Sequence, residues 1–335
     1  TGVGNVAVGR NALTALNFDG NGYNTAVGYV AGAAVTTGVQ NTLIGSFAGD
    51  ALTTGVQNVA VGYNALSTED GHGGNVAVGV SALSTLNAGA DGYNTAVGHV
   101  AGTAVTTGVQ NTLIGAFSGD AITTGNFNVT LGHNSLSSNT VGFGSVALGH
   151  SALADQNYST ATNAYNTAVG HVAGENVTTG TLNTLIGGLA GDAITTASNN
   201  TAVGYASLGA VTTGVENTVV GSAAGDALTT GIRNVAMGYA ALTADTKGQH
   251  NVAIGYSALF AQNSTSAFNA YNTAVGSSAG ASVTTGGSNT LIGGLAGDAL
   301  TGADFNTVVG ATALGGDTLG GYSTAIGYGS LGSQN

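Results

Sequence analysis

Three histidines occupy equivalent places in consecutive copies of a repeated sequence motif: His133, His150 and His171. If the copies stack, their imidazoles come close together, and because histidine is the commonest metal ligand this row is a candidate metal or anion site. A metal ion usually takes about three or four ligands, however, and neither cysteine nor a carboxylate cluster accompanies these histidines. We therefore favour a neutral row of surface imidazoles, and we expect no cofactor.

Five aspartates also recur at one place in the motif, each between a glycine and an alanine: Asp50, Asp120, Asp192, Asp226 and Asp298. A ladder of calcium ions is one interpretation, but the dense aspartate pattern of calcium-binding nonapeptide repeats is missing. An aspartate that bonds its own backbone in a turn explains the pattern better.

Catalytic constellations do not stand out from the repeat. No Ser-His-Asp arrangement, no pair of carboxylates and no glycine-rich loop between a strand and a helix is recognisable. The 59 glycines recur where the repeat must turn. We therefore expect a protein that is not an enzyme.

The repeat that carries these residues fills the chain. If the Asn of Asn24-Thr25-Ala26-Val27-Gly28 is offset 0, nineteen copies follow one another, fourteen of the eighteen intervals being 17 residues, two 19 and two 21. Offset 0 is Asn or Ser, offset +3 is aliphatic or Met, and offset +4 is always Gly. Internal repeats of short period are typical of solenoids, in which each copy stacks on the next.

The four long intervals depart from this regularity at one corner of the repeat. They lie in Thr14–Tyr23, Ser84–Tyr93, Ala154–Tyr165 and Phe260–Tyr271, and each ends in a tyrosine directly before the Asn: Tyr23, Tyr93, Tyr165 and Tyr271. Tyrosine offers a rigid amphipathic contact surface, so these four are candidate receptor contacts for a glycan or a protein. The alternative is that each tyrosine covers the corner and the loop merely bulges.

Composition excludes several partners. Fifteen acidic residues against three basic ones give a net charge of −12, which opposes binding to nucleic acid. No apolar run approaches the roughly 18 residues of a membrane span, so we expect no membrane insertion. The chain has no cysteine and therefore no disulfide.

Seventeen residues per repeat favour one coil of an all-β parallel β-solenoid, with about 19 coils in all. Stacking would join Asn24 and Asn41 in a ladder of side-chain amides. We expect Val27 and Ile44, at offset +3, to form an aliphatic column inside the coil, and Gly28 and Gly45 to allow a close corner. A second short strand is expected over offsets +7 to +11.

The other apolar residues, Ala at offset +2 and Leu or Ala at +7 and +8, would then form a continuous outer surface. A surface of that size marks an interface, so we expect it to pack around an axis shared with two identical chains.

The motif resembles two families. Asn-Thr-Ala-Val-Gly repeats are similar to the YadA-like head of trimeric autotransporter adhesins, and the longer pattern of 24–38, 41–55 and 217–231 is still more similar to the repeats of bacteriophage tail fibres. The resemblance implies a left-handed β-roll that forms homotrimers, is extracellular or on the virion surface, and acts as the shaft or head of a fibre for host attachment. An adhesin head and a self-assembling extracellular filament are the alternatives.

We expect residues 1–335 to form a single repetitive domain. Because Thr1 and Asn335 both fall inside a copy of the motif, we interpret the chain as a segment of a longer array.

Overall fold

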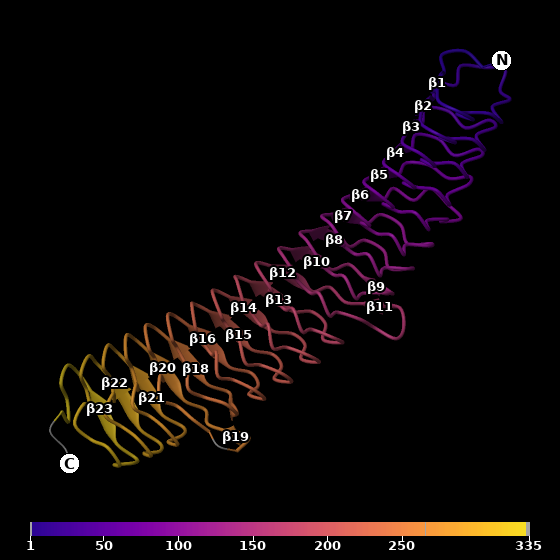
Figure 1. Ribbon diagram of the computed structural model, residues 1–335. Helices are drawn as coiled ribbons and strands as arrows, with labels where there is room; N and C mark the ends of the chain where they lie inside the picture. The colour runs from indigo at the N-terminus through magenta and orange to yellow at the C-terminus, as the bar shows by residue number, and fades with distance from the viewer. Residues whose placement is uncertain (1, 265, 333–335) are drawn as a thin grey trace. The chain divides into compact units, whose positions relative to one another are not determined.

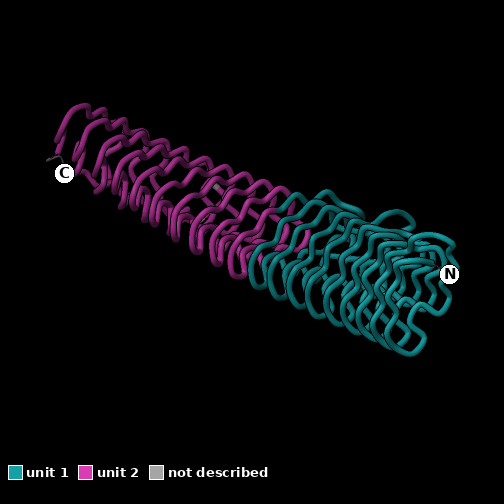
Figure 2. The backbone as a smooth tube through the Cα atoms, turned by 90° about the horizontal axis from the view of Figure 1, so that it is seen from above, with its two compact units in different colours: residues 1–166 teal, residues 167–335 magenta. Residues whose placement is uncertain are grey.

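The computed structural model is an all-β parallel β-solenoid of about 19 turns, with about 17 residues in each turn (Figure 1). It describes residues 2–264 and 266–332, and within these ranges no helix is found. The chain forms two compact units, Thr1–Asn166 and Thr167–Asn335 (Figure 2). Thr1 and Asn335, on which the expectation of a truncated array depends, lie outside the described residues.

Each turn of unit 1 contributes one three-residue strand to a parallel sheet: β1 (Val6–Val8), β2 (Thr25–Val27), β3 (Thr42–Ile44), β4 (Val59–Val61), β5 (Val76–Val78), β6 (Thr95–Val97), β7 (Thr112–Ile114), β8 (Val129–Leu131) and β10 (Val146–Leu148). Two shorter strands form a separate pair, β9 (Gly142–Phe143) and β11 (Thr162–Asn163). This pair lies apart from the line of three-residue strands in Figure 1.

Unit 2 repeats the arrangement. Its sheet contains β12 (Thr167–Val169), β13 (Thr184–Ile186), β14 (Thr201–Val203), β15 (Thr218–Val220), β16 (Val235–Met237), β18 (Val252–Ile254), β20 (Thr273–Val275), β21 (Thr290–Ile292), β22 (Thr307–Val309) and β23 (Thr324–Ile326). Its separate pair is β17 (Gly248–Gln249) and β19 (Phe268–Asn269).

The register places equal offsets side by side. Val59 of β4 lies opposite Val76 of β5, and in unit 2 Thr290 of β21 lies opposite Thr307 of β22. The insertion in residues 75–93 does not shift this register, because Val76 still faces Thr95. The extra residues are therefore absorbed outside the sheet.

The asparagine ladder is confirmed. Asn41 is buried, its Nδ2 donates to Oδ1 of Asn24 at 3.1 Å and to the carbonyl oxygen of Gly55 at 2.8 Å, and its backbone N–H donates to the same Oδ1 at 3.0 Å. Asn58 in turn donates its backbone N–H to Oδ1 of Asn41 at 2.9 Å. A buried amide costs free energy unless it is paired, and both ends of the Asn41 side chain find partners in the stack.

The glycines at offset +4 form the expected close corner. Gly28 and Gly45 have φ angles of 147° and 134°, in a region that side chains with a Cβ rarely adopt. A Cβ on Gly28 would also collide with the carbonyl oxygen of Gly45 in the next turn. Both backbone conformation and stacking distance therefore require glycine.

The placement of Val27 and Ile44 inside the coil was wrong. Offset +2 is buried, as in Ala26 and Leu43, whereas Val27 is only partly buried and Ile44 is 38% exposed. The reason is the alternation of side chains along a strand: since the buried Asn occupies offset 0, offset +2 shares its inward direction and offsets +1 and +3 point outward.

The expected second strand was also wrong. Offsets +7 to +11 are turns in the regular coils, and the chain is bent by left-handed residues at +6 and +8, such as Val30 (φ 62°) and Gly32 (φ 57°). The side chains of Ala31 and Val35, at +7 and +11, still point inward and are fully buried. Turns rather than a strand therefore close this side of the coil.

The interior is filled by residues whose sizes compensate between turns. Leu43 projects from offset +2 into the space left by two glycines at offset +8, Gly32 and Gly49, since a Cβ on either would approach a methyl carbon of Leu43 at 2.6 or 2.7 Å. Where offset +2 is the smaller Ala60, offset +8 is the larger Leu66. Offsets +2, +7 and +8 are therefore the core, and they do not form the outer apolar surface that was expected.

Candidate functional site

The four tyrosines that end the insertions share one conformation. Tyr23, Tyr93, Tyr165 and Tyr271 all have left-handed backbones, with φ angles of 51°, 48°, 47° and 49°. Their side chains are also comparably exposed, at 57, 58, 56 and 52%. In unit 1 each ring lies against a glycine at the same offset of the preceding turn, Gly4, Gly74 or Gly144. In unit 1 each tyrosine thus covers a corner, as the alternative interpretation of the sequence predicted. More than half of the surface of each of the four tyrosines is nevertheless exposed and available for contact.

The 21-residue turns build additional structure beside their tyrosines. In unit 1 the pair β9 and β11 places Asn163 opposite Phe143, next to Tyr165. In unit 2 the pair β17 and β19 places Asn269 opposite Gln249, next to Tyr271. Thr265, within the insertion of Phe260–Tyr271, lies outside the described residues.

A buried polar residue at offset +11 precedes three of the insertions, and our sequence analysis missed it. Regular turns carry an aliphatic residue there, such as Val35 or Leu52, but the turns before the insertions carry Glu69, Asn139 and Asp245, all fully buried. The signal was present as the interruption of the Thr-Thr-Gly segment in these turns.

Each of these residues caps its own turn. Glu69, Asn139 and Asp245 accept a hydrogen bond from the backbone N–H three residues further on, at 3.0, 3.1 and 2.9 Å respectively. Short polar side chains commonly bond nearby backbone in this way.

The two carboxylates also hold the inserted loop of the next turn. Oε2 of Glu69 accepts the backbone N–H of Ala88 at 3.3 Å, and Oδ1 of Asp245 accepts that of Ser264 at 3.0 Å. Burial raises the pKa of Asp245, and the hydrogen bonds from the backbone N–H groups lower it by less. These buried acids therefore act as anchors for the insertions.

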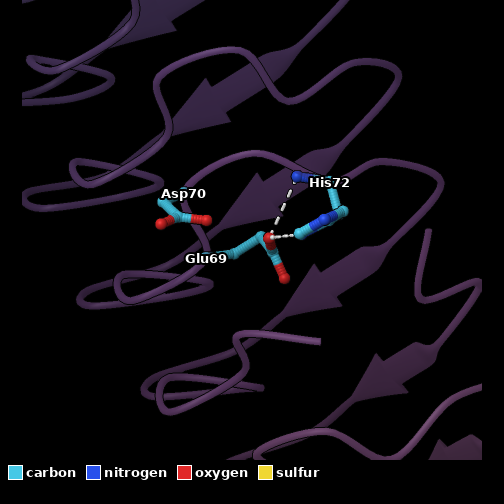
Figure 3. A group of neighbouring side chains, drawn as sticks. All are labelled: Glu69, Asp70 and His72. Carbon is cyan, nitrogen blue, oxygen red and sulfur yellow. Dashed lines mark hydrogen bonds and ion pairs between the residues drawn. The ribbon is translucent and has the colours of Figure 1, made fainter. Parts of the chain in front are cut away.

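Glu69, Asp70 and His72 form the one group among the described residues whose side chains lie close enough to share a metal ion (Figure 3). Oε1 of Glu69 already accepts the backbone N–H of His72, and Nδ1 of the same histidine lies 3.1 Å from it. With Oε2 bonded to Ala88, both oxygens of the buried carboxylate are engaged. This geometry favours a loop anchor over a metal site.

The predicted histidine row is exposed. His133 and His150 stack with ring centroids 5.4 Å apart and planes 9° from parallel. The lone pairs of imidazole nitrogens lie in the ring planes, so two parallel rings do not direct them at one ion. His171 is exposed in unit 2. The arrangement of the stacked pair favours the row of surface imidazoles over a metal site.

The recurring aspartates lie at the edge of the core. Burial raises the pKa of Asp50 and Asp120, and the hydrogen bond that each carboxylate accepts from its own backbone lowers it by less. Burial likewise raises the pKa of Asp192, Asp226 and Asp298. Bonds to the local backbone are those expected of a turn-forming carboxylate.

Comparison with known proteins gives no further indication. No family model matches the chain, and no match is found among curated proteins or among solved structures. Within residues 2–264 and 266–332, no helix has the length and apolar character needed to cross a membrane.

Proposed function

We propose that the chain is a shaft or head segment of a homotrimeric extracellular fibre, that a bacteriophage tail fibre is the best candidate for that fibre, and that it serves host attachment without catalysis. The observation that carries the proposal is a row, within each unit, of partly exposed aliphatic or methionine side chains at offset +3. It includes Ile44 and Leu131 in unit 1, 38 and 51% exposed, and Met237 in unit 2, 41% exposed. The left-handed β-roll and the number of three chains come from the resemblance.

Charge supports a second copy as the occupant of this face. The chain carries a net charge of −12, so two copies repel one another over most of their surfaces. The outward strand positions are free of charge, since offset +1 is always Val or Thr and offset +3 always aliphatic or Met. The sheet face is therefore where like-charged copies can approach, and burying its row of aliphatic groups would stabilise the assembly.

Aspartate substitutions on this face test the proposal. Ile44→Asp combined with Ile114→Asp places two carboxylates per chain at offset +3 of β3 and β7, where they would meet their symmetry mates in a trimer. We expect the mass measured by light scattering to fall from three chains to one, with an unchanged circular dichroism spectrum.

The matched control is Thr37→Asp with Thr107→Asp, because both threonines are exposed and lie away from the strands. The control should remain trimeric. A double aspartate variant on the strands that keeps the mass of the parent would refute the proposed interface.

A further inference from the structure

A pocket of about 360 Å³ opens on unit 1 beside the 21-residue turn. Three aromatic side chains, two amides and one glycine line it: Asn126, Phe127, Phe143, Gly144, Asn163 and Tyr165. Its volume lies in the range of about 300–1,000 Å³ that is typical of small-molecule sites.

The stacking of three turns builds this pocket. Phe127, Gly144 and Tyr165 occupy the same offset in successive turns, directly before the ladder residue, and all three have left-handed backbones. Because the middle member is glycine, the Tyr165 ring lies against it, and residue 144 places no side chain of its own between Phe127 and Tyr165. The pairing of β9 with β11 places Asn163 opposite Phe143, which directly precedes Gly144. Oδ1 of Asn126 accepts the backbone N–H of Val109 at 2.7 Å, which fixes that amide.

The lining selects a neutral ligand with both apolar and hydroxyl surfaces. Aromatic faces carry negative charge density and attract C–H groups, while amides donate and accept hydrogen bonds. No charged side chain lines the pocket. We propose that it binds a neutral pyranose residue of a glycan, whose ring has C–H faces and an equatorial rim of hydroxyls. This inference rests on the proposed function, because it names the class of receptor that the fibre would contact.

Unit 2 contains the corresponding place in a filled form. His250 replaces the glycine and stacks on Tyr271, with ring centroids 5.1 Å apart. Arg233 stands where unit 1 has Phe127, and its Nε lies 2.7 Å from Oε2 of Glu216. Gly144→His would place the histidine of unit 2 at the equivalent position of unit 1, where it is expected to fill the pocket.

The test is calorimetric titration of the intact chain with the neutral tetrasaccharides of glucose (α-1,4 and β-1,4), mannose and N-acetylglucosamine, alongside a neutral tetrapeptide. We expect at least one tetrasaccharide to bind, Tyr165→Ala and Gly144→His to weaken it by about tenfold or more, and Tyr271→Ala to leave it unchanged. Circular dichroism melting of each variant establishes that it is folded.

Binding of none of the four sugars, binding that survives both pocket variants, or binding of the peptide instead would overturn the inference. Light scattering on the same samples separates this outcome from a failure of the proposed function. A trimer that binds no sugar refutes the pocket alone, whereas a monomer whose sugar binding depends on Tyr165 refutes the trimer alone.

Discussion

The two 21-residue turns, 145–165 in unit 1 and 251–271 in unit 2, solve the same packing problem with different side chains. Both add a short strand pair, and both carry a buried glutamine at offset +11, Gln156 or Gln262. In unit 1 the polar anchor of the preceding turn is the neutral Asn139, whereas in unit 2 it is the acidic Asp245. The backbone of an insertion therefore constrains where polar atoms must lie but not whether they carry charge.

The residue at offset +13 differs in step with the anchor. In unit 1 this residue is the buried Tyr158, whose hydroxyl accepts a hydrogen bond from Nδ2 of Asn166 at 3.2 Å. Unit 2 places the smaller Ser264 there, and its backbone N–H reaches Asp245. The residue at offset +13 therefore changes in size and in hydrogen bonding together with the anchor of the preceding turn: Tyr158 follows Asn139, and Ser264 follows Asp245.

The largest expected effect comes from the glutamines. Nε2 of Gln156 donates a hydrogen bond to Oγ of Ser145 at 2.9 Å, and Oε1 of Gln156 accepts one from Nδ2 of Asn166 at 2.8 Å. Ser145 occupies the ladder position of that turn. Gln262 accepts a hydrogen bond from Nδ2 of Asn272 at 2.7 Å, and its own Nε2 donates only a long bond, of 3.4 Å, to Oγ of Ser264. Gln156→Leu should therefore cost about 3 kcal/mol of the free energy of unfolding and Gln262→Leu about 1.5 kcal/mol, as measured by urea unfolding.

Leucine is a fair replacement because the 19-residue turns carry it at this offset, in Leu16 and Leu86. Equal losses for the two variants would show that the serine at position 145 does not depend on its glutamine.

An intermediate effect is expected at alkaline pH in unit 1. Burial raises the pKa of Tyr158 to about 12, and the hydrogen bond from Asn166 lowers it by less. Since the unfolded chain loses this proton near pH 10, the folded state holds more protons between the two values and stability falls as pH rises through that window.

Tyr158→Phe should remove about 1–2 kcal/mol of this loss, measured as the difference between thermal melts at pH 9.5 and pH 11.5. A variant with the same alkaline loss as the parent would contradict the burial of the hydroxyl.

The smallest expected effect lies on the acid side of unit 2. The pKa of Asp245 is raised by burial, so between its unfolded and folded values the folded chain binds more protons. Stability contributed by this residue therefore rises as pH falls through the raised pKa, and is complete below the unfolded value.

Asp245→Asn abolishes the titration and copies the neutral anchor of unit 1. The difference in unfolding free energy between parent and variant should move in favour of the parent as urea titrations are carried from pH 7 toward pH 4. A difference that is constant, or that moves the other way, would exclude Asp245 as a buried acid.

Much of the fold was predictable because it repeats. The spacing of the asparagines established the stacking, and the invariant glycine marked the corner, since both depend on contacts between identical residues. Which face of the strand points inward was not predictable from size alone. Val27 and Ile44 are bulkier than Ala26, yet the buried Asn24 at offset 0 sets the alternation and turns them outward.

The candidate site was predictable only in part. Tyr165 drew attention because it ends an insertion, but Phe127 and Phe143, which also line the pocket, belong to regular turns. The anchors Glu69 and Asp245 replace the aliphatic residue of regular turns, but their burial and their bonds to the next turn could not be read from the sequence.

The proposed trimer requires that the outward face at offsets +1 and +3 of the strands is covered by further copies of the chain. Sedimentation equilibrium of the intact protein measures this directly. We predict a particle of three times the 32.0 kDa of one chain. A single species of 32.0 kDa that stays monomeric at all concentrations would contradict the proposed trimer.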